Sequence, residues 1–282
     1  MSPAGLQAVS CQGCGGAVAM PAGAPHPRCL FCGSEAVVLM PTEGIELPGT
    51  FLPFEVDQAG AQAKFRDKAQ ASIWYPGDLR DATLELDPLL LPAWIWSGQV
   101  ETHWAALVRG STRSGKRPRT GSDTKRVRGV LVPSSSAISR AELDSIAPFS
   151  GANSFMFRAD QAVAPFELGK LTRTAARKAA CDALAQQHRA ELASANATVS
   201  FSGSHLFREL EGQPLLLPVY VGAYRRRGKL HRVVINGQSG AITGEFPKSW
   251  LRIGCAVLLF GFIAAGLGLA LLLLIWAATL YL

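Results

Sequence analysis

Pro88-Leu-Leu-Leu-Pro92-Ala-Trp94-Ile-Trp96 is an apolar stretch that returns later in the chain as Pro214-Leu-Leu-Leu-Pro218-Val-Tyr220-Val. In both copies, aromatic side chains stand at alternating positions, which is typical of the start of a strand. The copies indicate either two equivalent strand pairs in one sheet or a duplicated half-domain. An accidental recurrence of an apolar pentapeptide is an equally weighted alternative. Two copies are too few for a solenoid, which needs about three repeats.

Before the first copy, the sequence predicts a strand followed by a helix. Phe51-Leu-Pro-Phe-Glu-Val reads as the strand, and Asp57 is a suitable N-cap for the helix. Helical spacing predicts that Phe65, Ala69 and Ile73 lie on one buried face.

Between and after the copies, further elements are expected. Ser139 and Glu142 have the spacing of a capping box, and an alanine-rich helix is predicted over 170–195. Strands are expected at 198–207, 219–224, 230–236 and 241–245. We therefore predict an α+β fold with an antiparallel sheet over residues 46–249, with a possible internal duplication.

Two cysteine pairs near the N-terminus carry the strongest chemical signal: Cys11 with Cys14, and Cys29 with Cys32. Each pair has C-x-x-C spacing followed by a glycine, which permits the positive φ that such a turn needs. Two pairs together predict a four-sulfur zinc site. A redox dithiol would instead be a single pair at a helix start. Because four thiolates leave no open position, we expect one structural Zn²⁺ in a zinc ribbon over residues 1–45, with His26 as a loop residue.

A basic segment runs from residue 109 to residue 128 with Asp123 as its only acidic residue. Its aromatic-free composition favours a solvated hairpin loop, because nucleic-acid surfaces usually add stacking rings to charge. Contact with anionic lipid and contact with nucleic acid are the alternatives. The candidate basic surface consists of Arg113, Lys116, Arg117, Arg119, Lys125 and Arg126.

Residues Ile253 to Leu282 contain no charged side chain. About 20 apolar residues cross a bilayer core, so this stretch predicts a single C-terminal transmembrane helix over residues 250–282. Positive charge before a span predicts that the bulk of the protein faces the cytoplasm from the inner membrane. The flanking basic residues are Arg225, Arg226, Arg227, Lys248 and Arg252.

Small residues within this stretch have the spacing of helix-packing motifs. Gly261 is four residues from Ala265, and Ala264 is four residues from Gly268. Such pairs let two membrane helices approach closely. Small residues are also common in membrane helices without any packing role, which is the favoured interpretation.

Composition agrees with metal binding and leaves the partner open. The formal charge of +7 suits either anionic headgroups or nucleic acid. Of six cysteines, four lie in the two tight pairs, which favours a metal site over a disulfide framework.

No motif for catalysis was identified. Ser134, Ser135 and Ser136 lack the glycines of a nucleophile elbow. Cys181 and His188 lie seven residues apart on the predicted helix, where core or surface placement outweighs a Cys/His site. The sequence therefore predicts a protein that is not an enzyme and offers no evident small-molecule substrate.

Several pieces of the sequence resemble a bacterial family of membrane proteins with a TFIIB-type zinc ribbon, whose members often carry primosomal or helicase-like names. These pieces are the two cysteine pairs, 51–57, 74–79, 91–94, 130–134, 217–220 and 234–240. The chain lacks the G-x-x-x-x-G-K-[ST] loop that a helicase needs. The resemblance implies partners of the flotillin-like (SPFH) and phage-shock type in an envelope-stress assembly.

These expectations combine into a tail-anchored, zinc-binding adaptor that recruits protein partners to the membrane. A membrane-tethered nucleic-acid-binding protein that uses the ribbon and the basic segment is the alternative.

Overall fold

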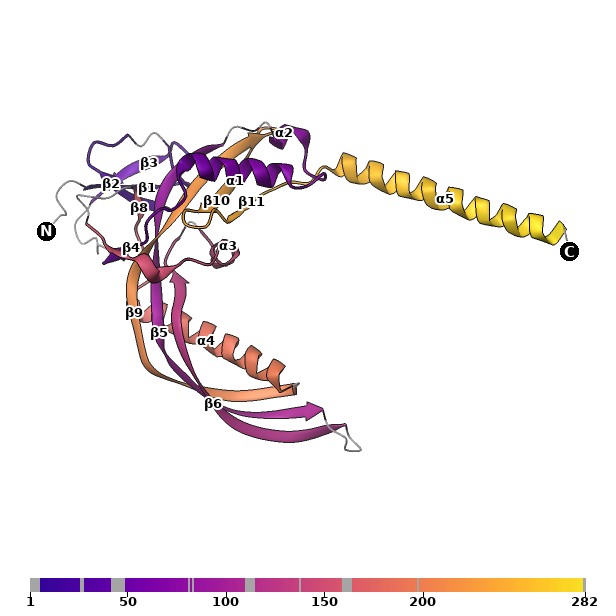
Figure 1. The fold of residues 1–282 in the computed structure, drawn as a ribbon. Coiled ribbons are helices and arrows are strands. Elements are labelled where there is room, and N and C mark those ends of the chain that lie inside the picture. The colour runs from indigo at the N-terminus through magenta and orange to yellow at the C-terminus, as the bar shows by residue number, and fades with distance from the viewer. Residues whose placement is uncertain are drawn as a thin grey trace.

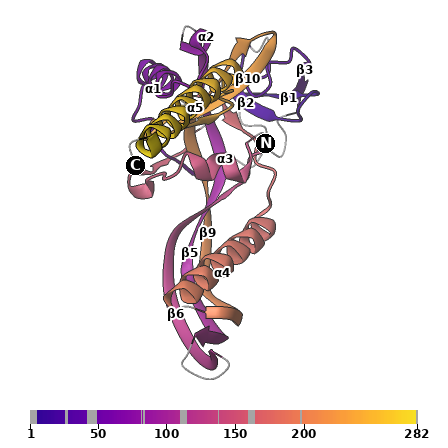
Figure 2. The same ribbon diagram turned by 90° about the vertical axis from the view of Figure 1, so that its right-hand side faces the viewer.

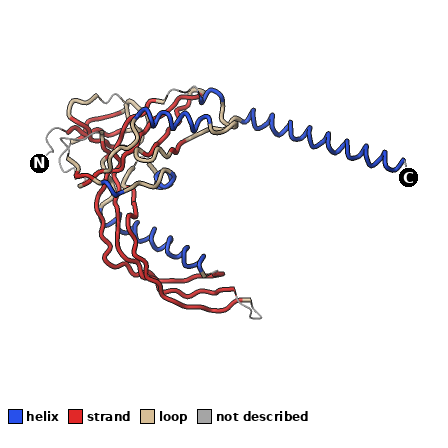
Figure 3. Tube along the Cα trace, viewed as in Figure 1, coloured by secondary structure: helices blue, strands red, loops and turns tan. Residues whose placement is uncertain are grey.

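The computed structural model describes residues 6–25, 28–41, 49–80, 82, 84–109, 115–136, 138–158, 164–196 and 198–280. Strands dominate this part of the chain, at 44% against 27% helix, as Figure 3 shows. All eleven strands of the described residues belong to one sheet. The architecture is therefore organised by a sheet and not by helical layers.

The sheet follows the order β11-β10-β9-β5-β8-β2-β1-β3, with β6 beside β5 and β4 beside β7 and β9. Most pairings are antiparallel, but β4 with β9 and β5 with β8 are parallel, so the sheet is mixed. The strands are β1 (Leu6–Cys11), β2 (Ala17–Pro21), β3 (Val37–Met40), β4 (Thr50–Phe51), β5 (Glu85–Arg109), β6 (Lys116–Pro133), β7 (Phe155–Met156), β8 (Phe166–Glu167), β9 (Thr198–Arg226), β10 (Lys229–Asn236) and β11 (Ile242–Gly244).

The two PLLLP copies lie on β5 and β9 and pair with each other. The register places Leu90 opposite Pro218 and Pro92 opposite Leu216, in antiparallel orientation. The leucines of both copies are buried in the main cores. Their recurrence thus corresponds to neighbouring strands of one sheet, whereas duplication of a half-domain stays a prediction.

Beyond the body of the sheet, β5, β6 and β9 continue together as a curved three-stranded arm (Figure 1). The register of β5 shifts against β6 between Trp96 and Gly98, and against β9 between Ser97 and Gln99. Such bulges bend and twist strands. A Cβ added at Gly98 would lie 2.8 Å from the Cα of Leu210, so glycine is required at this bend.

The longest helix of the domain, α4 (Arg173–Ala195), packs along the arm (Figure 2). The side chain of Thr172 caps its first turn by accepting from the N–H of Ala175. Ala176 and Ala180 pack against Trp96 near the bend, and Leu184 joins a second cluster with arm residues. The small alanines allow the helix to approach the sheet closely.

The remaining helices lie around the body of the sheet: α1 (Gln58–Gln70), α2 (Gly77–Arg80), α3 (Arg140–Ser145) and a 3₁₀ turn (Gly151–Asn153). Asp57 caps α1, and the capping box of Ser139 and Glu142 opens α3, as predicted. Phe65 and Ala69 are buried as expected, but Ile73 is 69% exposed because α1 ends before it.

The last helix, α5 (Trp250–Leu280), extends away from the body (Figure 1). Within the described residues, no helix combines the length and the apolar character needed to cross a membrane.

The predicted fold class is therefore wrong in two respects. The prediction of an α+β fold on an antiparallel sheet underestimated the strands, because β5, β6 and β9 continue through polar segments that read as loops. The prediction of a single C-terminal transmembrane helix over 250–282 is not supported by the described part of the chain.

Candidate metal centre

The two cysteine pairs form a pair of matching turns. In the first, the N–H of Gly15 donates to the carbonyl of Cys11, and in the second the N–H of Gly33 donates to the carbonyl of Cys29. Both glycines have positive φ, at 72° and 71°. The predicted role of the glycine after each second cysteine is confirmed.

The turns bring all four sulfur atoms together, with every Sγ within 4.8 Å of the others. Two of the contacts, Cys11 with Cys32 and Cys14 with Cys29, join the turns at 3.6 Å. A tetrahedral ion with bonds of about 2.3 Å to sulfur separates its ligands by about 3.8 Å. The cluster therefore fits a four-thiolate metal site.

Backbone N–H groups and burial oppose each other at these thiols. Burial raises the pKa of Cys11, but the N–H groups of Cys14 and Gly13 lower it to about 7. Burial raises the pKa of Cys29 and also that of Cys14. Cys11 therefore ionises before Cys14 and Cys29, and the thiolate is the form that binds a metal.

The ribbon strands β1, β2 and β3 belong to the large sheet through the pairing of β2 with β8. The ammonium group of Lys170 also donates to the carbonyl of Gly15 at 2.9 Å. Phe31 packs over Gly16, whose added Cβ would lie 2.6 Å from the ring. The cysteine cluster is therefore attached to one end of the large sheet.

A cavity of about 410 Å³ lies beside the ribbon. Its wall is mostly apolar, and Asp87 and Arg28 supply its charged groups. Burial raises the pKa of Asp87. Arg28 forms an ion pair with Glu85 across the ribbon and β5.

The predicted basic surface is on a strand and not in a loop. Lys116, Arg117, Arg119, Lys125 and Arg126 all lie on β6, whereas Arg113 lies outside the described residues. Lys125 forms an ion pair of 2.5 Å with Glu191 on α4. The expected hairpin loop is therefore wrong for residues 116–128, which belong to a strand that pairs with β5.

The predicted membrane-flanking residues lie in two places. Arg225, Arg226 and Arg227 are at the turn between β9 and β10, where Arg226 bonds Asp78. Lys248 precedes α5, and the side chain of Arg252 lies outside the described residues. The small residues Gly261, Ala264, Ala265 and Gly268 are exposed on α5, and their packing role stays a prediction.

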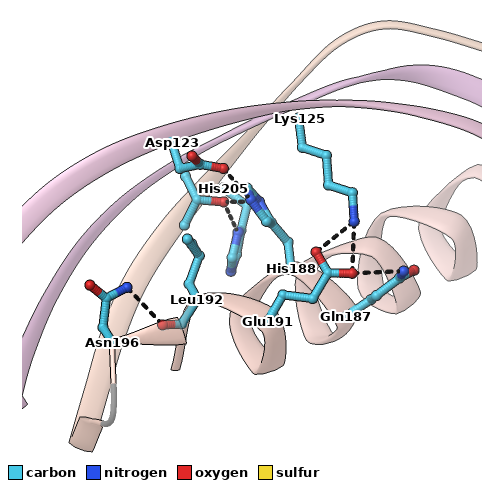
Figure 4. Close-up of polar contacts among 9 residues, drawn as sticks. Asp123, Lys125, Gln187, His188, Glu191, Leu192, Asn196 and His205 are labelled. Carbon is cyan, nitrogen blue, oxygen red and sulfur yellow. Dashed lines mark hydrogen bonds and ion pairs between the residues drawn. The ribbon is translucent and has the colours of Figure 1, made fainter. Parts of the chain in front are cut away.

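The sequence did not identify a buried polar cluster between α4 and the arm (Figure 4). The hydroxyl of Thr102 lies 2.8 Å from Nδ1 of both His188 and His205. Nε2 of His188 lies 2.7 Å from a carboxylate oxygen of Asp123. Asp123, Thr102 and His205 occupy one row across the three strands of the arm.

When both imidazoles are neutral, the available donors and acceptors determine which ring nitrogen carries each hydrogen. A carboxylate only accepts, so His188 donates to Asp123 from Nε2 and its Nδ1 must accept from the hydroxyl of Thr102. The hydroxyl has one hydrogen, so Nδ1 of His205 donates to it. Each of the three contacts then joins one donor to one acceptor.

An acid, an imidazole and a hydroxyl in contact resemble a catalytic triad in composition. Thr102 is fully buried, however, and its oxygen is already bonded to both imidazoles. A nucleophile must reach its substrate, so this arrangement serves to hold α4 on the arm. Residue spacing gave no sign of it, because its members come from four separate elements.

The chain matches no protein-family model, no curated protein and no solved structure.

Proposed function

We propose that this protein is a metal-stabilised adaptor that binds a protein partner without catalysing a reaction. The cysteine cluster carries this proposal. Its four sulfur atoms take all positions of a tetrahedral ion and leave none for substrate or activated water. Thiolate-only ligands favour zinc, and the role assigned to the ion is structural.

The architecture supports an adaptor in a second way. A rigid ribbon lies at one end of the sheet and a long arm extends from it (Figure 1). The one acid–imidazole–hydroxyl chain among the described residues is closed to substrates by the burial of Thr102. The elongated shape offers separate surfaces for contact instead of a reaction chamber.

Crosslinking in cells followed by purification tests the proposal. Wild type is compared with Cys14→Ser/Cys32→Ser and with the control Cys181→Ser, whose cysteine is outside the cluster. We expect one partner to be recovered with wild type and control but lost with the double variant. Flotillin-like and phage-shock-type proteins are the partner class that the family resemblance suggests. An identical partner set for all three proteins would contradict recognition by the metal-stabilised ribbon.

A further inference from the structure

The side of β6 that faces away from β5 forms a long edge of the sheet. β6 pairs with β5 in unbroken register from Val127 to Lys116. In the part of the chain that the structure describes, no second strand pairs with β6, and Figure 2 shows it at the outer side of the arm. An edge strand presents a row of N–H and C=O groups that can pair with another chain.

Apart from Asp123, the exposed charges along this edge are basic, and they lie on both faces of the arm. Arg117 and Arg119 share the face of Asp123, toward α4, because side chains on a strand alternate. Arg126 lies on the opposite face. All three arginines are exposed. The edge therefore attracts negative charge above and below the plane of the sheet.

Contacts from α4 hold this edge in place. Asp123, the single acidic residue of β6, bonds His188, and Lys125 bonds Glu191 (Figure 4). The carboxylate of Asp123 thus has a hydrogen-bond partner within the protein. These contacts also order the strand before any partner arrives, which lowers the entropy lost on binding.

The distribution of charge selects among possible partners. Two copies of β6 would place two strongly basic strands side by side, and like charges directly opposite each other are destabilising. A nucleic acid is best bound by a one-sided basic surface with stacking aromatics, whereas these arginines are split between two faces. A polypeptide strand also presents side chains on both faces, so its carboxylates can meet both sets.

We propose that the free edge of β6 accepts an acidic polypeptide segment as an added strand of the arm. This inference rests on the proposed adaptor function and names the chemistry of its partner. Backbone hydrogen bonds supply the pairing, and carboxylates opposite Arg117, Arg119 and Arg126 supply the selectivity. Directly opposite side chains in an antiparallel pair have Cβ atoms about 4.5–5.5 Å apart, close enough for these ion pairs.

Fluorescence anisotropy with the purified full chain tests the proposal at low ionic strength. The probe is a labelled peptide of about 12 residues that alternates glutamate with threonine and valine, long enough to pair with the regular part of β6. A second peptide has the same charge but carries prolines at alternate positions, which cannot donate ladder hydrogen bonds. An oligothymidine of similar length serves as the competitor.

We expect saturable binding of the first peptide and at least tenfold weaker binding of the proline peptide. Arg117→Ser/Arg119→Ser/Arg126→Ser should weaken binding about tenfold, from loss of three cross-strand charge pairs. The matched control Arg225→Ser/Lys229→Ser/Lys248→Ser removes three exposed charges away from the arm and should leave binding unchanged. Circular dichroism confirms that both variants are folded.

Equal affinity for both peptides would overturn strand addition, as would an equal effect of the two triple variants. Displacement by a tighter-binding oligothymidine would assign the edge to nucleic acid instead. The probe does not depend on the ribbon cysteines. If the peptide does not bind, the strand-addition proposal fails but the crosslinking test of the adaptor function is unaffected. If the crosslinking test fails, the peptide result is likewise unaffected.

Discussion

Leu91 on β5 lies directly opposite Leu217 on β9, and both side chains are buried. These are central leucines of the two PLLLP copies, so the strongest apolar segments of the chain stabilise each other. The pairing joins the ribbon side of the sheet to the strands β9 and β10. We call this pairing of the two PLLLP copies the seam, and we expect the stability of the sheet to depend on it.

Leu217→Ala should lower the free energy of unfolding by about 2–5 kcal/mol, the usual cost of deleting a buried leucine side chain. Leu206→Ala on the same strand is the control, because Leu206 is 48% exposed. Urea denaturation of both variants measures the difference. Similar losses for the two would show that the seam does not support the body of the sheet.

Gly98→Ala should destabilise the arm by roughly 1–3 kcal/mol, as expected for overpacking against atoms that cannot move aside. The added Cβ would meet backbone atoms of Leu210 and Glu209 within 3.0 Å. Gly49→Ala is the control, since nothing lies within 4 Å of its added Cβ. Thermal unfolding monitored by circular dichroism makes the comparison, and unchanged stability of Gly98→Ala would refute a requirement for glycine at the bend.

Cys14→Ser should abolish stoichiometric metal binding, because a hydroxyl is a poor substitute for thiolate in a soft-ligand site. Mass spectrometry of the anaerobically purified protein measures metal content, and limited proteolysis reports on the ribbon. Cys181→Ser should retain the metal. A full metal complement in Cys14→Ser would remove that cysteine from the ligand set.

Acidification should weaken the attachment of α4 to the arm. Burial lowers the pKa of His205, and the nearby His188 and Arg189 lower it further. The folded protein then binds this proton less readily than the unfolded chain. The stabilising contribution is complete above the unfolded histidine pKa of about 6.5 and is lost as the pH falls through the folded value.

Denaturation at about pH 7.5 and about pH 5.5 spans the range in which histidine changes charge. The stability lost between them in wild type should shrink in His205→Gln, which carries no titrating imidazole. The other charged groups that face this cluster are Asp123, Glu191 and Arg189. NMR titration of His205 gives the sign directly, and a pKa above that of a model histidine would contradict the prediction.

Local features with a fixed chemical requirement were predictable from the sequence. The cysteine pairs, their glycines and the caps at Asp57 and Ser139 each involve residues within a few positions of one another. The pairing of the PLLLP copies could be predicted only in part, because similarity between two strand sequences does not specify that the two strands pair with each other.

Features that depend on residues far apart in the chain could not be predicted from the sequence. The segment after Lys116 read as a loop because its residues are polar and basic, yet it extends as a strand because β5 supplies its hydrogen bonds. The contact of Thr102 with His188 joins residues whose types suggest nothing in isolation. Tertiary pairing overrode local propensity at these positions.

The seam between β5 and β9 also determines the order in which the molecule can be made. The cysteine pairs are close in the chain, so the ribbon can close around its ion early during translation. The PLLLP segment of β5 must wait until β9 has left the ribosome, whereas residues 93–109 can pair with β6 as soon as that strand is made. The leucines of the first PLLLP copy are therefore exposed while the residues up to β9 are being made, and transiently exposed apolar surface makes a folding chain prone to aggregation.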